Sequence, residues 1–474
     1  MRARQNRGDR ASRRRQRGAG ALLLIITLIV ILTIVFAPRL TLWQVHNAAG
    51  GRGYQTLIDA KAAILAHASN PDADPVAGRR LGQISLTPDL PITAGTTYDG
   101  LSKPGCATRT WAPGQALIDP NTFATSLNVR CFGRFPWLSY GLAGPSTPDD
   151  QLGEVPWMFL SANLVVGATC LGNLNPLMLS SGYTGGCTTP VPFPWLNVVD
   201  GRGNLLSSEV AIVLILPGPP VNGAQGRTSP IDLSPSAYLE GLTVAAAGCP
   251  APCVPGTYNN AAYTVVNGQA WTFVNASSST ELGQQPAYYA QPFTFNDRLI
   301  YITATEYFEA MEQRARKTAL STLAAFRSAH SYMPYSGNTP LTGNCSSGLH
   351  FGLLPNNANC GGPLNYPLWF TDAGWGSYFI YAVDSGCVAS APVCTTPTLR
   401  LGASATPYNA VLFSPGRAIR NLPYAVPKSA AQAPVASGSL NDFLDSAANV
   451  TGPTFDAAGT PPRANYNDRM YGIL

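Results

Sequence analysis

Charged side chains are scarce in this sequence of 474 residues, since Asp, Glu, Lys and Arg together make up only 12% of it. A typical soluble domain contains roughly 25%. Apolar residues nevertheless reach 45%, which is enough to build a core and argues against a disordered chain. The 46 glycines and 41 prolines favour many short strands joined by turns over long solvated helices.

The body of the chain also lacks the positive charge that nucleic-acid binding requires. Residues 1–18 contain eight arginines and one aspartate, which leaves 22 basic and 24 acidic residues in the rest of the chain. The net charge of +5 therefore comes from the leader, and we expect no nucleic-acid partner. An arginine cluster beside an apolar run is instead typical of a segment that sets membrane orientation.

Catalytic signatures are absent as well. The sequence has no G-x-S-x-G, H-E-x-x-H or phosphate-loop pattern, and its four histidines are far apart. We therefore expect no enzyme activity, no cofactor and no metal. The CPAPC stretch at 249–253 has a spacing near that of a zinc knuckle, but its prolines and the lack of a matching second pair disfavour zinc.

No cysteine precedes Cys106, and ten follow the apolar run. An even number of cysteines in this position fits an oxidising compartment. We expect neighbouring cysteines to form disulfides, although sequence alone leaves the connectivity open. The expected couples are Cys106 with Cys131, Cys170 with Cys187, Cys249 with Cys253, Cys345 with Cys360, and Cys387 with Cys394.

Residues 19–37 form an apolar run without a single charge. As a helix this run spans about 28 Å, close to the hydrocarbon thickness of a bilayer. A transmembrane helix is therefore predicted over residues 19–38, with the arginines in the cytoplasm and the body on the far side. A cleaved secretory signal is the alternative, but its apolar region is usually shorter and FAPRL is a poor cleavage site.

The basic leader ends in RQRG and passes directly into the apolar run, and this start resembles that of type IV pilins and type II secretion pseudopilins. The resemblance implies that a prepilin peptidase cuts after Gly18 and makes Ala19 the first residue, with Gly20 as the second choice. It also implies a helix held in the lipid bilayer that packs against other pilin-like subunits. Leu23 stands where the family usually has glutamate, which favours a minor subunit. An ordinary uncleaved signal anchor is the alternative.

Four sequence blocks occur twice in the same order, which indicates an internal duplication. Each copy reads as a helix, an irregular cysteine-bearing segment, an aromatic strand, a very apolar strand and a closing strand. A helix on an antiparallel sheet, used twice, predicts a disulfide-bearing α+β body. The paired blocks are 55–69 with 317–331, 153–161 with 376–384, 211–227 with 409–421, and 294–303 with 465–474.

Two helices of this body are indicated by local spacing. Leu57, Ala60, Ile64 and Ala68 recur at helical spacing and are predicted to pack on the body. In the second copy, TATE at 303–306 predicts a capping box at the start of a helix. Further along that helix, Glu312 and Arg316 are predicted to form an i,i+4 pair on the face away from the apolar stripe.

The predicted organisation has five parts. They are a basic cytoplasmic leader (1–18), a transmembrane helix (19–38), a helical stem (39–70), a first α+β unit (71–302) and a second α+β unit (303–474).

The tripeptide NDR stands at the same point of both copies, as Asn296-Asp297-Arg298 and Asn467-Asp468-Arg469. Repetition favours an architectural role, in which the aspartate fixes a turn and the arginine reaches a carboxylate or carbonyl. Two further motifs are GRFPW at 133–137 and YLEG at 238–241. With NDR, they give the body a resemblance to large bacterial proteins that have prepilin-like amino termini and uncharacterised body domains.

Together these features predict a structural or adhesive minor subunit, or an assembly accessory, of a type IV pilus or type II secretion apparatus. The expected location is the bacterial inner membrane, spanned once, with the body in the periplasm or on the cell surface. The alternatives are a stand-alone envelope-anchored binding protein and an envelope hydrolase. A hydrolase would require a polar cleft with converging carboxylates.

Overall fold

The structure is a computed structural model of the whole chain. The chain divides into two compact units, residues 1–56 and 57–474, and every described strand belongs to the second. The residues described are 54–70, 81, 84, 101, 131–142, 155–161, 164, 174–179, 195–201, 203–217, 238–244, 256–261, 264–265, 271–275, 297–337, 345, 348–355, 360, 364–389, 394, 397–416, 440, 444, 447–456 and 468–474.

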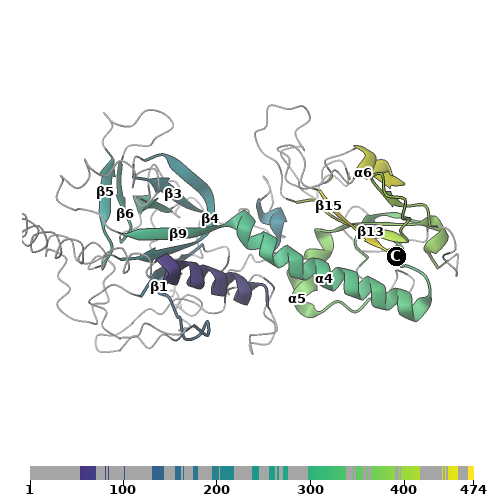
Figure 1. The fold of residues 1–474 in the computed structure, drawn as a ribbon, viewed down its shortest axis with the longest axis horizontal. Helices are drawn as coiled ribbons and strands as arrows, with labels where there is room; N and C mark the ends of the chain where they lie inside the picture. The colour runs from purple at the N-terminus through teal and green to yellow at the C-terminus, as the bar shows by residue number, and fades with distance from the viewer. Residues whose placement is uncertain are drawn as a thin grey trace, which may run out of the picture. The chain divides into compact units, whose positions relative to one another are not determined.

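The first half of the body contains a mixed sheet of seven strands (Figure 1). Its order is β1-β2-β4-β3-β8-β7, with β9 paired to β4, and β3 runs parallel to β8. A separate antiparallel pair is formed by β5 (Gly241–Val244) and β6 (Gly256–Asn259). The strands of the sheet are β1 (Cys131–Arg134), β2 (Trp157–Leu160), β3 (Leu196–Asp200), β4 (Leu205–Leu216), β7 (Thr264–Val265), β8 (Trp271–Asn275) and β9 (Arg298–Thr303), and a short 3-10 helix, η4 (Pro176–Leu179), lies between β2 and β3 in the chain.

The centre of this sheet is β4, which pairs with β2, β3 and β9. Its residues 211–216, all of them apolar, are buried. Ile212 and Leu214 belong to one hydrophobic core, whereas Val213 and Ile215 belong to another. Successive side chains of a strand point to opposite faces, so this single strand separates and supports two cores.

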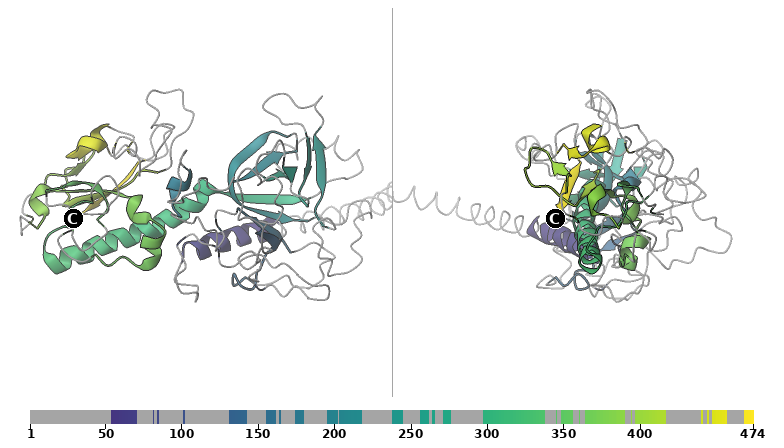
Figure 2. Two further views of the ribbon diagram at one scale, coloured as in Figure 1. Left: turned by 180° about the vertical axis from the view of Figure 1, so that it is seen from behind. Right: turned by 90° about the vertical axis from the view of Figure 1, so that its right-hand side faces the viewer.

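Helix α4 (Ala304–His330) continues from β9 without an intervening loop (Figure 2). Thr303 caps the helix, because its hydroxyl oxygen accepts a hydrogen bond from the backbone N–H of Glu306 at 3.1 Å. This confirms the helix start predicted from TATE. The apolar face of the helix is buried and comprises Phe308, Met311, Ala315, Ala319, Leu323 and Phe326.

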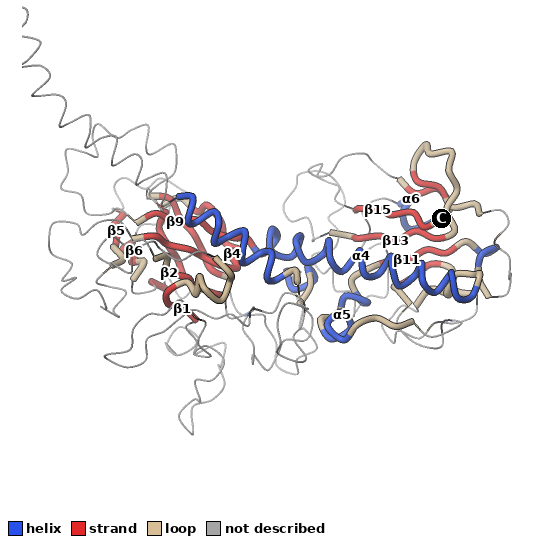
Figure 3. The backbone as a smooth tube through the Cα atoms, turned by 60° about the horizontal axis from the view of Figure 1, so that its bottom comes forward, coloured by secondary structure: helices blue, strands red, loops and turns tan. Residues whose placement is uncertain are grey.

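The second half of the body contains a four-stranded antiparallel sheet of order β10-β11-β13-β15, and α4 runs alongside it (Figure 3). Its strands are β10 (Phe351–Leu353), β11 (Ile380–Val383), β13 (Ala410–Ser414) and β15 (Arg469–Ile473). The remaining elements are α5 (Leu368–Asp372), η8 (Trp375–Ser377), η9 (Ser385–Cys387), β12 (Arg400–Leu401), α6 (Ala447–Thr451) and β14 (Thr454–Phe455), with β12 parallel to β14.

The repeated sequence blocks supply equivalent strands in the two sheets. Strands β2, β4 and β9 are neighbours in the first sheet, and β11, β13 and β15 are neighbours in the same order in the second. All these pairings are antiparallel, and their registers agree residue for residue with the alignment of the blocks. Matched pairs are Trp157–Ile215 with Ile380–Phe413, and Ile212–Ile302 with Ala410–Ile473.

The helix over residues 54–68 lies within the predicted stem. Its stripe of Leu57, Ala60, Ile64 and Ala68 is fully buried in the larger hydrophobic core, as predicted. The ammonium group of Lys61 binds the carboxylate of Glu306 at 2.8 Å and the backbone carbonyl of Tyr301 at 3.0 Å. Lys61 therefore ties this helix to the junction between β9 and α4.

Two of the expected cysteine couples are disulfides, Cys345–Cys360 and Cys387–Cys394. The side chains of the other six cysteines (Cys106, Cys131, Cys170, Cys187, Cys249 and Cys253) lie outside the described part of the chain.

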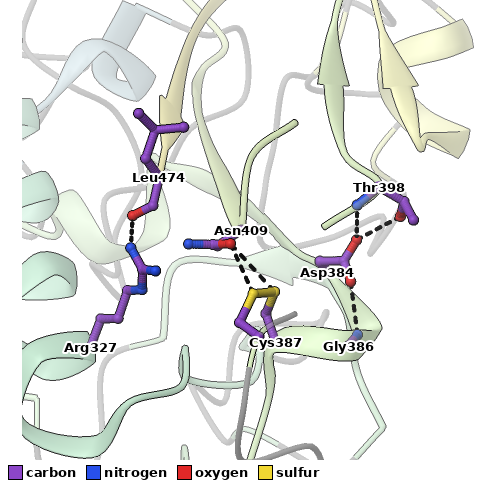
Figure 4. The surroundings of a disulfide bond; sticks show 8 residues. Arg327, Asp384, Gly386, Cys387, Thr398, Asn409 and Leu474 are labelled. Atoms are coloured by element: carbon purple, nitrogen blue, oxygen red, sulfur yellow. Dashed lines mark hydrogen bonds between the residues drawn. A yellow bond between two sulfur atoms is a disulfide. The ribbon is translucent and has the colours of Figure 1, made fainter. Parts of the chain in front are cut away.

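The second disulfide sits in a loop that buried Asp384 holds together (Figure 4). One oxygen of Asp384 accepts a hydrogen bond from the backbone N–H of Gly386 at 2.8 Å. The other accepts from the backbone N–H and the hydroxyl of Thr398, at 2.6 and 2.5 Å. The side chain of Asn409 in turn lies beside both sulfur atoms. The two ends of the loop are thus fixed by one carboxylate as well as by the covalent bond.

The predicted fold class is corrected in two respects. Among the helices that the structure describes, none is both long and apolar enough to cross a membrane, so the structure does not support the predicted transmembrane helix. Residues 19–38 themselves lie outside the described part. The longest described helix, α4, has only one apolar face and carries Glu306 in its first turn and Arg327 in its last. The first sheet is also mixed rather than antiparallel, because β3 pairs in parallel with β8.

Substitution of Gly352 by alanine tests the close approach of β10 to the preceding segment. A Cβ at this position would lie 2.2 Å from the carbonyl oxygen of Gly337, and the backbone there is held by hydrogen bonds between Gly337 and Leu353. We expect Gly352→Ala to lower the free energy of unfolding by about 1–3 kcal/mol, measured by urea denaturation. Gly386→Ala, where the nearest atom is a side-chain oxygen at 3.2 Å, is the control. Equal effects of the two substitutions would contradict the expectation.

Candidate functional site

The motifs GRFPW, YLEG and NDR, which are far apart in the sequence, come together at one end of the first sheet. Arg134 of GRFPW is buried, and its guanidinium lies 4.1 Å from the ring centroid of Tyr238 and 4.5 Å from that of Trp157. It also donates a hydrogen bond to the carbonyl of Val155 at 3.0 Å. The cation is therefore enclosed by aromatic faces that attract it.

Next to Tyr238, the carboxyl groups of Glu240 and Asp297 face each other inside the protein. The backbone N–H of Glu240 donates to Asp297 Oδ2 at 3.0 Å, and the backbone N–H of Asp297 donates to Glu240 Oε2 at 3.1 Å. The side-chain amide of Asn260 adds a third hydrogen bond, to Asp297 Oδ2 at 3.1 Å. We call Glu240, Asn260 and Asp297 the carboxyl cluster. Glu240 is 6% exposed and Asp297 only 2%.

The second NDR motif is built in a related way. Asp468 is buried, and its Oδ2 accepts a hydrogen bond from the side-chain amide of Asn449 at 3.0 Å. The amide oxygen of Asn449 accepts from the backbone N–H of Asp456 at 2.7 Å, just as that of Asn260 accepts from the N–H of Val274 at 3.0 Å. In both halves an asparagine thus links the motif's aspartate to a separate stretch of backbone.

A second polar group, which we call the helix–sheet cluster, joins α4 to the second sheet and consists of Glu312, Tyr378, Ser414 and Arg469. Glu312 accepts hydrogen bonds from the hydroxyls of Ser414 at 2.5 Å and Tyr378 at 3.1 Å. Arg469 Nη1 lies 3.8 Å from Glu312 Oε1. Burial raises the pKa of Glu312, although these partners oppose the shift. Burial, followed by the charge of Glu312, also raises the pKa of Tyr378 well above its usual value.

The exposed Glu312–Arg316 pair predicted from the sequence is wrong. Glu312 follows Met311 on the buried side of α4 and points toward the sheet. Arg316 instead donates to the hydroxyl of Tyr471 and lies over its ring. The i,i+4 spacing is suitable for an ion pair, but the carboxylate of Glu312 accepts hydrogen bonds from the hydroxyls of Ser414 and Tyr378 instead.

Arg469, the arginine of the second NDR motif, reaches from β15 to helix α4. It forms an ion pair with Glu309 and lies near Glu312, so it reaches carboxylates of the helix. Arg298 begins β9 and pairs with Leu216 across the sheet. Asn296 and Asn467 lie outside the described residues, as do the processing residues Gly18, Ala19 and Gly20.

Neither cluster has the form of an open catalytic site. Two carboxylates do converge at Glu240 and Asp297, but both are sealed from solvent, whereas a hydrolase needs them beside a cleft. Among the described residues, no three His, Cys, Asp or Glu side chains gather as a metal site would require. The geometry instead suits cross-linking of distant chain segments.

Glu312 should therefore matter for stability. We expect Glu312→Ala to lower the free energy of unfolding by about 3 kcal/mol, because the buried hydroxyls of Ser414 and Tyr378 lose their carboxylate acceptor and Arg469 loses one of its two neighbouring carboxylates. Glu312→Gln keeps one carbonyl acceptor and should cost about 1 kcal/mol.

Glu309→Ala is the matched control, since it removes a partly exposed ion pair with the same arginine and should cost less than about 1 kcal/mol. Urea unfolding midpoints compare the three variants. Equal destabilisation by Glu312→Ala and Glu309→Ala would rule out the role given to the buried carboxylate.

Comparison with known proteins found no relative for this chain. No protein-family model matches it, and no match was found among curated proteins or solved structures. Its function is therefore inferred from its own residues.

Proposed function

We propose that this chain is a pilin-like structural or adhesive subunit of an extracytoplasmic assembly, such as a minor subunit or accessory of a type IV pilus or type II secretion apparatus. The observation that carries the proposal is the burial of the polar clusters. The side chains of the carboxyl cluster and the helix–sheet cluster form hydrogen bonds with other parts of the chain. Residues used in this way support a rigid building block better than a catalyst.

The disulfides support a location outside the cytoplasm. Cys345–Cys360 and Cys387–Cys394 close short loops of the second half, and such bonds persist in oxidising compartments. The loop around Cys387 is further held by Asp384. A loop fixed in this way suits a subunit that must keep its shape without chaperones or cofactors.

The proposed partners are other pilin-like subunits, with a prepilin peptidase as the processing enzyme. The sequence RQRG before the apolar run supports this choice. The duplicated strand arrangement supports it as well, because it enlarges the body while the pairings of β2, β4 and β9 recur in β11, β13 and β15.

Mass spectrometry of the amino terminus tests the processing step. In cells that contain a prepilin peptidase, we expect the mature chain to begin at Ala19. Gly18→Ala should block the cut, because the resemblance places the peptidase specificity at this glycine. Gly20→Ala is the matched control and should leave the cut at Gly18 unchanged.

An intact leader in the presence of the peptidase would contradict the pilin-like function and favour the stand-alone binding protein. A cut that responds to Gly20→Ala rather than to Gly18→Ala would move the processing site by two residues. Crosslinking in intact cells, followed by identification of the attached chains, then tests whether other pilin-like subunits are the neighbours.

A further inference from the structure

The carboxyl cluster contains an oxygen whose surroundings indicate a proton. Asp297 Oδ2 accepts two hydrogen bonds, from the backbone of Glu240 and the side chain of Asn260. Asp297 Oδ1 is equally buried, yet it accepts no hydrogen bond from a described residue. A buried carboxylate oxygen without a donor is costly. A protonated oxygen in the same place would itself be a donor.

The acceptor for such a proton is the carboxylate of Glu240. The two side chains are held face to face by the reciprocal hydrogen bonds from each other's backbone. Two negative charges that face each other in a buried site repel strongly, and one of the two carboxyl groups is usually protonated. Burial first, and then the charge of Glu240, raises the pKa of Asp297 well above its usual range.

We propose that Asp297 carries a proton on Oδ1 at neutral pH and donates it to Glu240, so that the attachment of residues 238–240 to the start of β9 depends on pH. When the pH rises, this proton passes to water and leaves two adjacent carboxylates. The segment that carries Tyr238 is then held less firmly against β9. The device lies outside the proposed assembly function and does not depend on it.

Among the described residues, the other charged or titratable side chains around the cluster are two arginines and two tyrosines, Tyr238 and Tyr258. Arg134 from β1 lies over Tyr238, and Arg298 follows Asp297 at the start of β9; both arginines remain cationic. Tyr258 comes from β6, and burial raises its pKa above the usual value. The carboxylate of Glu240 is the proton acceptor in the proposal.

The sign of the pH effect follows from the raised pKa. In the unfolded chain Asp297 ionises near its ordinary pKa of about 3.9, whereas in the folded chain it stays protonated to a higher pH. The contribution to stability is therefore complete below the unfolded pKa and is lost as the pH rises through the folded pKa. In that interval the unfolding equilibrium constant rises by up to tenfold per pH unit.

Asp297→Asn provides the direct test, because an amide reproduces the acceptor at Oδ2 and the donor at Oδ1 without a titrating proton. Urea unfolding of the full chain is measured at several values between pH 5 and pH 9. We expect the wild-type stability to fall with rising pH, and Asp297→Asn to show a clearly smaller fall. At pH 8 it should be at least as stable as the wild type, whereas Asp297→Ala should be weaker at every pH.

Asp468→Asn is the matched control, since Asp468 occupies the same motif in the second half and, like Asp297, accepts a hydrogen bond from an asparagine amide. It should keep the wild-type slope. Should Asp297→Asn fail to fold, Glu240→Gln takes its place, because removal of the neighbouring charge lowers the pKa of Asp297 and must also reduce the slope.

Infrared spectroscopy gives an independent readout of the proton. In a Glu312→Gln background, which removes the other carboxyl of the described residues that burial gives a raised pKa, the folded protein at pH 7 should show the C=O band of a protonated carboxylic acid. The band should disappear in Asp297→Asn. Its absence at pH 7, an unchanged slope in Asp297→Asn, or an equal flattening by Asp468→Asn would overturn the proposal.

Discussion

A carboxylate removed from water must be supplied with hydrogen-bond donors, and much of this structure depends on that constraint. Glu312 receives hydroxyl groups from the second sheet, and Asp384 receives the donors of two loop segments. Asp297 receives the backbone of residue 240 and the amide of Asn260. In each case the donors come from distant or separate stretches of chain. These three buried carboxyl groups therefore link separate parts of the fold through hydrogen bonds.

The same constraint explains how the two halves differ while their strands agree. Strands β2, β4 and β9 pair in the same order and register as β11, β13 and β15. The aspartates before β9 and β15 each accept a hydrogen bond from an asparagine amide, and the one before β9 in addition faces the carboxyl group of Glu240. Backbone pairing in the sheets leaves the strand ends free to vary, so equivalent positions acquired different partners.

Regular features of the sequence predicted regular features of the fold. The apolar stripe beginning at Leu57 and the cap at Thr303 both depend on local spacing, and both are observed. The bonds Cys345–Cys360 and Cys387–Cys394 join neighbours in sequence, which is why proximity along the chain identified them.

Features that depend on distant partners escaped prediction. Nothing near Glu312 in the sequence indicates Ser414 or Tyr378, so a local ion pair with Arg316 was the reasonable but wrong choice. No local pattern in the sequence predicts that Glu240 of YLEG and Asn260 contact Asp297 of NDR. The parallel pairing of β3 with β8 likewise requires a long crossover that no short pattern encodes.

The direct passage of β9 into α4 has a mechanical consequence. Thr303 is both the last residue of the strand and the cap of the helix, so no slack chain separates them. Tension applied along this stretch cannot be absorbed by straightening a loop. The tension must be borne by the hydrogen bonds between β9 and β4, which are loaded in shear. A subunit under tension along β9 and α4 would therefore resist extension until these hydrogen bonds break.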